Sequence, residues 1–488
     1  MRHFVFAALA AALTLHGQSQ PWYQSDFPAE EFKARWTKLY DKIGSQAVAV
    51  VQGVSMTPGF NMPRQNNEFY YLSGLETPHS YLLLDGRSRK ATLFVPPRNR
   101  RLEAAEGRVL SAEDSAQLKM LTGADEVQDT EFMRTGNWLN IAAGRQQAPL
   151  TIYTLLSPGE GTAQSRHELA AANTAILNDS WDGRIPREMQ FASMLVTRFP
   201  RAKLADLTQV LDELRSLKSP REVAVIKRAS QIAGQGILEA MKSTKAGMTE
   251  YELDAAARYV FLVNGARLEG YRSITAAGTA NIWNAHYYRN MAKLDGGQLV
   301  LMDFAPDYRY YTSDVTRMWP VSGKYSAVQR ELLQFVLEYR NAVIKRIRPG
   351  VTAKQIMDEA KVAMEPVFAR TKFSKPSYEG AARELVERGG GVFSHPVGLA
   401  VHDDGPYNDG PLKPGHVFSI DPQLRVPDEN LYIRYEDVVA VTETGVENFT
   451  DFLASELDDM EKLVQTGGGM VQKYPPGPPA AAVPGAKK

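Results

Sequence analysis

The sequence predicts a two-domain protein in which a smaller α/β domain precedes a larger α+β domain. The chain has 488 residues, 44% of them apolar and 23% charged, so it can bury a large core and is too long for one domain. Strand and helix patterns alternate in the first half, which is typical of α/β domains. The second half combines long, capped helices with strand hairpins, which indicates helices packed on a curved antiparallel sheet.

The overall composition argues against several classes of function. The 56 basic and 56 acidic residues give a formal net charge of zero, so no basic excess points to nucleic acid or to an anionic membrane. The absence of cysteine excludes disulfides, thiol catalysis and cysteine-ligated zinc. A metal site would therefore depend on carboxylates and on the eight histidines.

Residues 1–19 have the pattern of a secretory signal peptide. Residues 4–15 are apolar except for Thr14, and the polar stretch HGQSQ follows them. An apolar run of this length is too short to span a bilayer. We therefore predict export to a periplasm or to the extracellular medium, without stable membrane insertion; a helix of the core is the alternative.

Residues 20–214 are predicted to form the α/β domain. Helix patterns cover 27–40, 166–177 and 187–198, and Ser111 can cap a further short helix. Strand patterns, separated by glycine or proline, cover 46–51, 67–74, 79–85, 90–96 and 151–156.

Residues 215–466 are predicted to form the α+β domain, in which capping boxes mark the starts of the helices. Ser219 is an N-cap, Pro220 takes the first helical position, and Glu222 follows three residues after the cap. The remaining residues, 467–488, are rich in glycine, proline and alanine and are predicted to be a disordered tail. Further capping pairs are Thr249/Glu252, Ser326/Gln329 and Thr352/Gln355, which predict helices over 250–264, 327–347 and 353–369.

A hairpin over residues 297–320 carries two aspartates. Strand patterns on either side of a turn near Tyr308 place Asp303 and Asp314 roughly opposite each other. Like charges facing each other on paired strands are destabilising, and a carboxylate in an apolar strand is costly to bury unpaired. A divalent cation between them would remove both costs, whereas a surface hairpin with solvated aspartates is the alternative.

Three further segments hold residues that could complete a metal site. His395 and His402 lie in 393–404, while Asp421 and Glu436 flank a second probable turn at residues 427–430. Four carboxylates and one imidazole can hold two divalent cations, and this ligand set favours Mn²⁺, Co²⁺ or Zn²⁺. Two such ions can share a hydroxide and polarise a carbonyl, which is the chemistry of metal-assisted amide hydrolysis.

Each of these residues also has a structural interpretation. His395 could cap a loop, His402 could be a core histidine, and Asp421 before Pro422 could be a turn residue. Glu436 could pair with Arg434 on a solvated strand, and His286 could be a stacked structural histidine. Five metal-competent residues at strand-like positions of one domain favour the metal site.

At this point the chain resembles the pita-bread metallopeptidases, in the branch of aminopeptidase P and prolidase. The resemblance covers residues 219–463 and continues into the first half, where NEFYYLSGLETPHSYLLL and KATLFVPPRN are similar to a creatinase/prolidase-type N-terminal domain. It implies a C-terminal pita-bread fold, a curved antiparallel sheet covered by helices. Five motifs in the family's order carry it: NAHYYRN, LMDFAPDYRYYTSDVTRMWPVSGKYS, SHPVGLAVHD, LKPGHVFSIDP and IRYEDVVAVTETG.

The resemblance implies a metal-ligating role for five residues. Asp303 and Asp314 would be ligands, with Asp314 bridging or bidentate, and His395 would bind one metal. Glu436 would bridge both metals, and Asp421 would occupy the position of a second glutamate. The implied cofactor is two divalent cations, manganese first, with zinc or cobalt as alternatives.

The resemblance also implies three residues that act on the substrate side. His286 and His402 would bind the scissile amide or stabilise the tetrahedral intermediate, and would help to move protons. Arg434 would lie close behind the metals. A hydroxide shared by the two cations would attack the amide bond before proline.

Two positions depart from the family pattern. Asp421 stands where the family usually has glutamate, so its carboxylate reaches one methylene less far, and we expect a more exchangeable metal. Gly391 stands four residues before His395, where many aminopeptidases P have a further histidine. This departure bears on how the proline side of the substrate is held, and so on the predicted preference for Xaa-Pro, but not on the predicted hydrolysis.

The sequence therefore predicts an exported metallo-aminopeptidase that removes an N-terminal residue ahead of proline. Its partner would be a peptide substrate, and the resemblance implies a homo-oligomer, a dimer or a tetramer. The alternatives are a prolidase-type dipeptidase, a metal-free hydrolase of the creatinase type, and a non-catalytic binding protein on the same fold. Metal content separates the last two from the first two.

Overall fold

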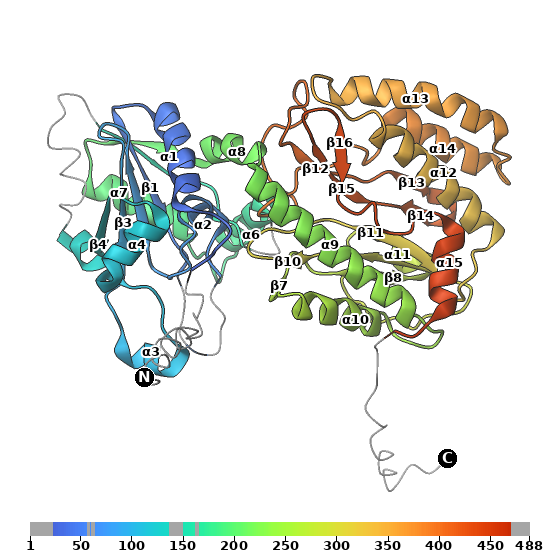
Figure 1. The fold of residues 1–488 in the computed structure, drawn as a ribbon, viewed down its shortest axis with the longest axis horizontal. Helices are drawn as coiled ribbons and strands as arrows, with labels where there is room; N and C mark the ends of the chain where they lie inside the picture. Colours follow the sequence, from blue (N-terminus) through green and yellow to red (C-terminus); the bar gives the residue numbers. More distant parts are fainter. Residues whose placement is uncertain (1–22, 56–58, 60–63, 136–149, 162–164, 470–488) are drawn as a thin grey trace, which may run out of the picture. The chain divides into compact units, whose positions relative to one another are not determined.

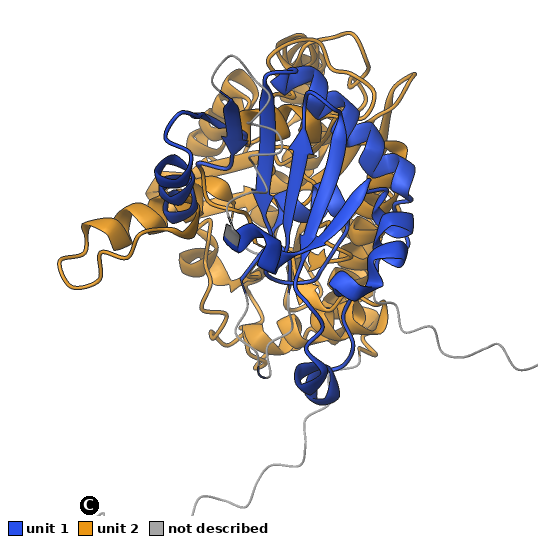
Figure 2. Ribbon diagram, turned by 90° about the vertical axis from the view of Figure 1, so that its left-hand side faces the viewer, with its two compact units in different colours: residues 1–156, 189–207 blue, residues 157–188, 208–488 orange. Residues whose placement is uncertain are grey.

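The structure is a computed structural model that describes residues 23–55, 59, 64–135, 150–161 and 165–469. The chain divides into two compact units, coloured separately in Figure 2: residues 1–156 with 189–207, and residues 157–188 with 208–488. The segment 157–188 thus belongs to the second unit, although it precedes the boundary predicted at 214/215. The predicted signal peptide, and the predicted tail from residue 470 onward, lie outside the described residues.

Unit 1 is built on a mixed six-stranded sheet (Figure 1). Its strands are β1 (Ala47–Gln52), β2 (Tyr81–Asp85), β3 (Lys90–Val95), β4 (Glu126–Asp129), β5 (Thr151–Thr154) and β6 (Lys203–Asp206). The strand order is β4-β3-β2-β1-β5-β6, in which β2 runs antiparallel to both neighbours and the other pairs are parallel. The helices are α1 (Ala29–Ile43), α2 (Asn67–Ser73), α3 (Arg100–Glu106), α4 (Ser115–Thr122) and α7 (Arg187–Arg198), with 3₁₀ turns at Ala112–Asp114 and Thr130–Thr135.

The strand predicted over 67–74 is wrong, because these residues form helix α2. Asn66 caps the helix by accepting a hydrogen bond from the Phe69 N–H, and Gly74 ends it in the left-handed conformation. All seven helical residues are buried, so the segment has no polar face from which a helical period could be recognised. The other predicted strands of this half are present, and the predicted helices over 27–40, 166–177 and 187–198 are confirmed.

Unit 2 combines long helices with short antiparallel strands. Its capping boxes at Ser219, Thr249, Ser326 and Thr352 are all formed, which confirms the predicted helix starts. The helices are α6 (Arg166–Asn178), α8 (Thr208–Ser216), α9 (Pro220–Ser243), α10 (Glu250–Val263), α11 (Gly278–Ile282), α12 (Ala327–Ile344), α13 (Ala353–Arg370), α14 (Pro376–Arg388) and α15 (Leu457–Thr466).

The strands of unit 2 form several small antiparallel sheets. The orders are β11-β9-β8, β12-β15-β16, β13-β14 and β10-β7. Their bounds are β7 (Leu268–Glu269), β8 (Ile274–Ala277), β9 (Leu299–Asp303), β10 (Pro306–Asp307), β11 (Thr316–Pro320), β12 (Val417–Ile420), β13 (Gln423–Val426), β14 (Leu431–Arg434), β15 (Asp437–Val441) and β16 (Val446–Asn448), with a 3₁₀ turn at Pro427–Glu429.

Strand β9 is buried on both faces, which explains its apolar sequence. Leu299 and Leu301 belong to the core cluster that contains residues of α12, α13 and α14, whereas Val300 and Met302 belong to the cluster with residues of α9 and α10. Because side chains alternate along a strand, Asp303 continues the row of Leu299 and Leu301. The aspartate is thus carried into the interior by a strand whose other side chains secure its burial.

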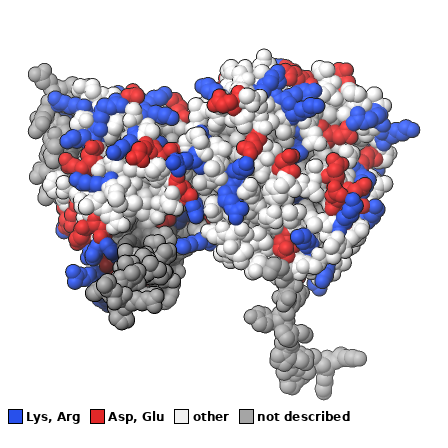
Figure 3. All heavy atoms as spheres, viewed as in Figure 1, with Lys and Arg blue, Asp and Glu red and all other residues white. Residues whose placement is uncertain are grey.

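The surface charge is mixed. Figure 3 shows lysine, arginine, aspartate and glutamate side chains interspersed over the visible face of each unit, in line with the formal net charge of zero. Among the helices of the described residues, none has the length and apolar character needed to cross a membrane.

Candidate metal centre

The first hairpin brings Asp303 and Asp314 together, as the sequence predicted. In the β9–β11 ladder the partner of Asp303 is Thr316, two residues after Asp314, so the two aspartates lie roughly rather than directly opposite each other. Arg309 has a positive φ of 54°, and the chain enters the second strand only at Thr316. Tyr271 bridges the two carboxylates, since its hydroxyl oxygen lies 2.6 Å from Asp303 Oδ1 and 2.9 Å from Asp314 Oδ1.

The second hairpin places Asp421 and Glu436 opposite each other. Ile420 pairs with Asp437 in the β12–β15 ladder, and Gln423 pairs with Arg434 in the β13–β14 ladder. The pairing continues from the first ladder to the second without a shift in register. Asp421 and Glu436, which lie between the two ladders, therefore face each other. Both side chains are buried.

A short bridge joins the two hairpins. Thr316 and Glu436 exchange backbone hydrogen bonds of 3.3 and 3.2 Å, and the Thr316 hydroxyl donates to Glu436 Oε2 at 2.9 Å. Arg317 donates to the Glu436 carbonyl at 2.7 Å and forms an ion pair of 2.7 Å with Asp437. The bridge places Glu436 so that one ligand atom each of Asp303, Asp314 and Glu436 lies within 4.8 Å of the others.

Arg434 lies among these carboxylates, as the resemblance implied. Its guanidinium is 2.7 Å from Asp303 Oδ2, 2.8 Å from Asp421 Oδ1 and 2.5 Å from Glu436 Oε2. Burial opposes its charge, but Asp421, Glu436 and Asp303 outweigh this effect and raise the pKa of Arg434 well above its usual range. The one positive charge of the Arg434 guanidinium is thus surrounded by three carboxylates.

The excess negative charge is visible in the protonation of the acids. Burial, followed by the neighbouring Asp303, raises the pKa of Asp314 well above its usual range. Burial, opposed by Arg434 and reinforced by Asp314, does the same to the pKa of Glu436. Glu436 Oε1 is buried and makes no hydrogen bond. A buried acidic cluster with an unused oxygen fits divalent cations, which supply the missing positive charge and take oxygen ligands.

Histidines line the other side of Asp314. His395 Nε2 lies 3.3 Å from Asp314 Oδ2, and the rings of His395 and His402 are in contact with centroids 4.3 Å apart. Asp314, His395 and His402 form a second group of close ligand atoms, so Asp314 belongs to both groups. Burial, then the charges of His395 and His286, lower the pKa of His402 to about 3, so its ring is neutral at neutral pH.

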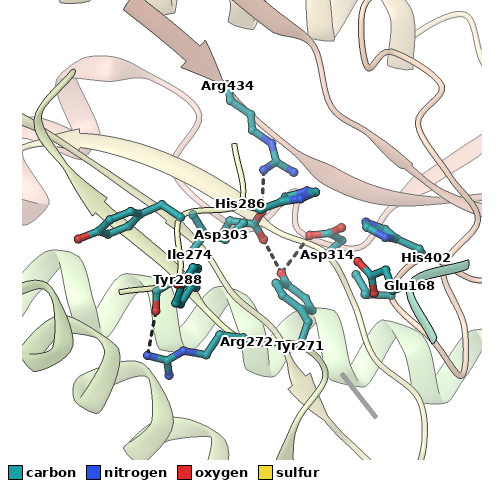
Figure 4. Close-up of a pocket in the computed structure, with 12 residues that line it drawn as sticks. Glu168, Tyr271, Arg272, Ile274, His286, Tyr288, Asp303, Asp314, His402 and Arg434 are labelled. Carbon is teal, nitrogen blue, oxygen red and sulfur yellow. Dashed lines mark hydrogen bonds and ion pairs between the residues drawn. The ribbon is translucent and has the colours of Figure 1, made fainter. Parts of the chain in front are cut away.

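A pocket of about 180 Å³ opens onto this cluster (Figure 4). Tyr271, Asp303 and Asp314 lie at its centre, with His402 on one side and Arg272 on the other. The predicted site residues His286 and Arg434 also line it. The pocket gives a substrate access to the carboxylates.

Asp421 is the one predicted ligand that joins neither group of close ligand atoms among the described residues. It is held by Arg434 at Oδ1 and by the side-chain amide of Gln423 at Oδ2. The structure therefore brings Asp303, Asp314, Glu436 and His395 together and leaves Asp421 beside them. That any of the five binds a metal stays a prediction.

Tyr271 and Glu168 line the pocket but were not predicted as site residues from the sequence. Tyr271 carries no recognisable sequence signal, because a hydroxyl aimed at two carboxylates leaves no trace in the spacing of residues. Glu168 lines the pocket from α6, and His167 beside it stacks on His402 with ring centroids 5.9 Å apart. The capping box of Ser165 and Glu168 marks the helix start, but not its neighbours in space.

Comparisons with known proteins identify the relatives of both halves. Residues 224–443 match the model of metallopeptidase family M24, and residues 32–140 match the model of the aminopeptidase P N-terminal domain. The chain is 29% identical to Xaa-Pro aminopeptidase of Escherichia coli over 463 residues, which cover 90% of this chain and 98% of that protein. It is 26% identical to a similar protein of Haemophilus influenzae, also named Xaa-Pro aminopeptidase, over 91% of this chain and 99% of that one.

Solved structures agree in fold. A variant of Escherichia coli aminopeptidase P matches with a TM-score of 0.71 at 26% identity, covering 91% of this chain and 99% of that one. Proline aminopeptidase P II of Yersinia pestis matches with a TM-score of 0.69 at 27% identity, covering 90% and 100%. The predicted fold class, a pita-bread domain preceded by a smaller α/β domain, is confirmed. The family models, the relatives and the solved structures together support the aminopeptidase P branch of metallopeptidase family M24.

Proposed function

We propose that this metallo-aminopeptidase is an exported enzyme that uses two divalent cations to hydrolyse the peptide bond between an N-terminal residue and a following proline. The observation that carries the proposal is the buried cluster of Asp303, Asp314 and Glu436 beside His395, in which Asp303 and Asp314 line a pocket. Two relatives that match along nearly their whole length are named Xaa-Pro aminopeptidase, which supports the substrate class.

The donor set supports two cations. Asp314 belongs to both groups of close ligand atoms, so it is the natural bridging ligand between a carboxylate-rich position and one that includes His395. The carboxylates and the imidazole suit Mn²⁺, with Zn²⁺ or Co²⁺ as alternatives. When bound, such a pair of cations polarises the scissile carbonyl and activates water.

The remaining residues act on the peptide. His402, neutral at neutral pH, can accept or donate a proton beside the scissile bond. The ring of His286 lies near the ring of His402, with centroids 6.4 Å apart. Arg434 holds three of the carboxylates in place. Charge-assisted bonds of this kind fix the ligands before a metal arrives.

The central experiment measures metal content and peptide cleavage in the chain expressed from residue 20 with Mn²⁺. We expect cleavage of an Xaa-Pro-containing tripeptide and its loss in Asp303→Asn, because that variant keeps the side-chain shape and removes a ligand charge. Asp295→Asn, which changes an exposed aspartate in the turn before the same hairpin, is the matched control. Cleavage of an Xaa-Pro dipeptide alone would instead indicate a prolidase, and a protein that binds no metal would contradict the proposal.

Export and self-association are separate proposals. The apolar run of residues 4–15 supports export, and a fusion of residues 1–19 to a reporter tests it by the reporter's location.

A homo-oligomer, a dimer or a tetramer, is proposed from the family resemblance, and light scattering of the purified protein gives the mass of the assembly directly.

A further inference from the structure

We propose that Gln423 is a positioning residue for Asp421, and that Gly391, Asp421 and Gln423 act as a linked set at this edge of the proposed metal centre. The inference rests on the proposed function, since it concerns one of the ligands of that metal centre.

Gln423 fixes the carboxylate plane of Asp421. Its side-chain amide donates to Asp421 Oδ2, while Arg434 Nε donates to Oδ1 at 2.8 Å. The two donors thus hold the two oxygens of one buried carboxylate. A carboxylate that binds a cation through one oxygen leaves the other to be oriented by a hydrogen bond, and such outer partners tune metal affinity.

Gly391 makes the room that this arrangement needs. Its φ is +72°, a conformation that favours glycine, and a Cβ at this position would overlap the carbonyl oxygen of Asp421. The same Cβ would lie 3.0 Å from Gln423 Cγ, which is closer than an ordinary contact. A side chain at residue 391 is therefore incompatible with the present positions of Asp421 and Gln423.

The backbone ties the three residues together. The Asp421 N–H donates to the Gly391 carbonyl at 2.9 Å, and the Gln423 N–H donates to the Gly390 carbonyl at 3.2 Å. The glycine segment thus runs against the strand that carries Asp421 and Gln423, so a change at any of the three positions is felt at the other two. The shorter ligand, its amide partner and the missing side chain form one structural unit.

The test is Gln423→Met, which keeps the length of the side chain and removes the donor. Mn²⁺ is titrated calorimetrically into the metal-free full-length protein. We expect one of two cations to bind about 10- to 100-fold more weakly in the variant, with the other unchanged, because only one metal position depends on Asp421. Gln298→Met, another half-buried glutamine of unit 2, at the start of β9, is the matched control and should bind both cations as the wild type does.

A double-mutant comparison separates positioning from general stability. In an Asp421→Asn background, Gln423→Met should cause no further loss of affinity, because the donor then has no carboxylate to orient. Equal affinities in wild type and Gln423→Met would overturn the inference, as would an additive loss in the double variant. A wild-type protein that binds no Mn²⁺ would instead contradict the proposed function, which keeps the two failures distinguishable.

Discussion

Tyr271 is an uncharged residue that contacts two carboxylates of the cluster, those of Asp303 and Asp314. Burial, then the charges of Asp303 and Asp314, raise the pKa of Tyr271 well above its usual range, so the hydroxyl stays protonated between two acids. The hydroxyl thus lies between Oδ1 of Asp303 and Oδ1 of Asp314, whereas Oδ2 of Asp303 faces Arg434 and Oδ2 of Asp314 faces His395.

Tyr271→Phe should therefore weaken Mn²⁺ binding. We expect a loss of about 10-fold or more in affinity, measured by calorimetric titration, because the variant removes a hydrogen bond that orients two ligands at once. Tyr308→Phe, in the turn of the same hairpin, should leave the affinity unchanged. An unchanged affinity in Tyr271→Phe would mean that the aspartates are oriented by Arg434 and the backbone alone.

At the same scale, the sequence was informative about charge and uninformative about proximity. A carboxylate within an apolar strand, as at Asp303 or Asp421, is costly unless it serves a site, so its chemistry can be inferred from its neighbours in the chain. Tyr271 and Glu168 are ordinary residues in ordinary patterns, and only folding brings them to the pocket. Arg434 could be placed near the metals only through the family resemblance.

At the scale of elements, local signals predicted helix starts well and buried short segments poorly. Ser219, Thr249, Ser326 and Thr352 each carry their own hydrogen-bond partners three residues on, so the prediction needs no tertiary information. Helix α2 is buried on all sides, and a short apolar run of this kind is equally compatible with a strand. The exact register of the first hairpin could not be predicted either, because its irregular turn includes Arg309 with positive φ and the second strand begins only at Thr316.

His416, directly before β12, provides a test of an element by pH. Burial, then the charges of Lys218 and Lys413, lower the pKa of His416 to about 4, and its Nδ1 accepts the Lys413 N–H at 3.3 Å. The unfolded chain binds the proton more readily, with a pKa of about 6.5. The neutral ring therefore contributes fully above pH 6.5, and stability falls as the pH drops from there toward 4.

We expect His416→Asn to remove this part of the pH dependence. The difference in the free energy of unfolding between wild type and variant should shrink by roughly 1–2 kcal/mol between pH 7 and pH 4, after allowance for screening by solvent. Urea titrations at several pH values measure it, and taking the difference cancels the many carboxylates that titrate in both proteins. A difference that is constant with pH would contradict the assignment of a buried neutral ring.

At the scale of the whole molecule, a buried ion network fixes the segment 157–188 within unit 2. Glu160 is fully buried and lies 2.6 Å from Arg215 and 3.1 Å from Arg166, the first residue of α6. Arg215 also pairs with Asp403, which directly follows His402. The network thus connects the helix that carries Glu168 to the loop that carries a predicted substrate-side histidine, and no sequence pattern reveals such a connection between distant segments.

Glu160→Gln should destabilise unit 2 and disturb the pocket together. Removing one partner from a buried ion network leaves a charge uncompensated, so we expect a loss of about 3 kcal/mol in the free energy of unfolding. Glu131→Gln, which breaks an exposed pair with Arg134 in unit 1, should have little measurable effect. Because burial and the nearby Glu160, acting against Arg166, raise the pKa of Asp404 to about 6, the variant should also lower that pKa. A fall in stability with unchanged peptide cleavage would show that the network serves the fold alone, whereas a joint fall in stability and in the rate of Xaa-Pro cleavage would show that α6 and the His402 loop are held as one functional unit.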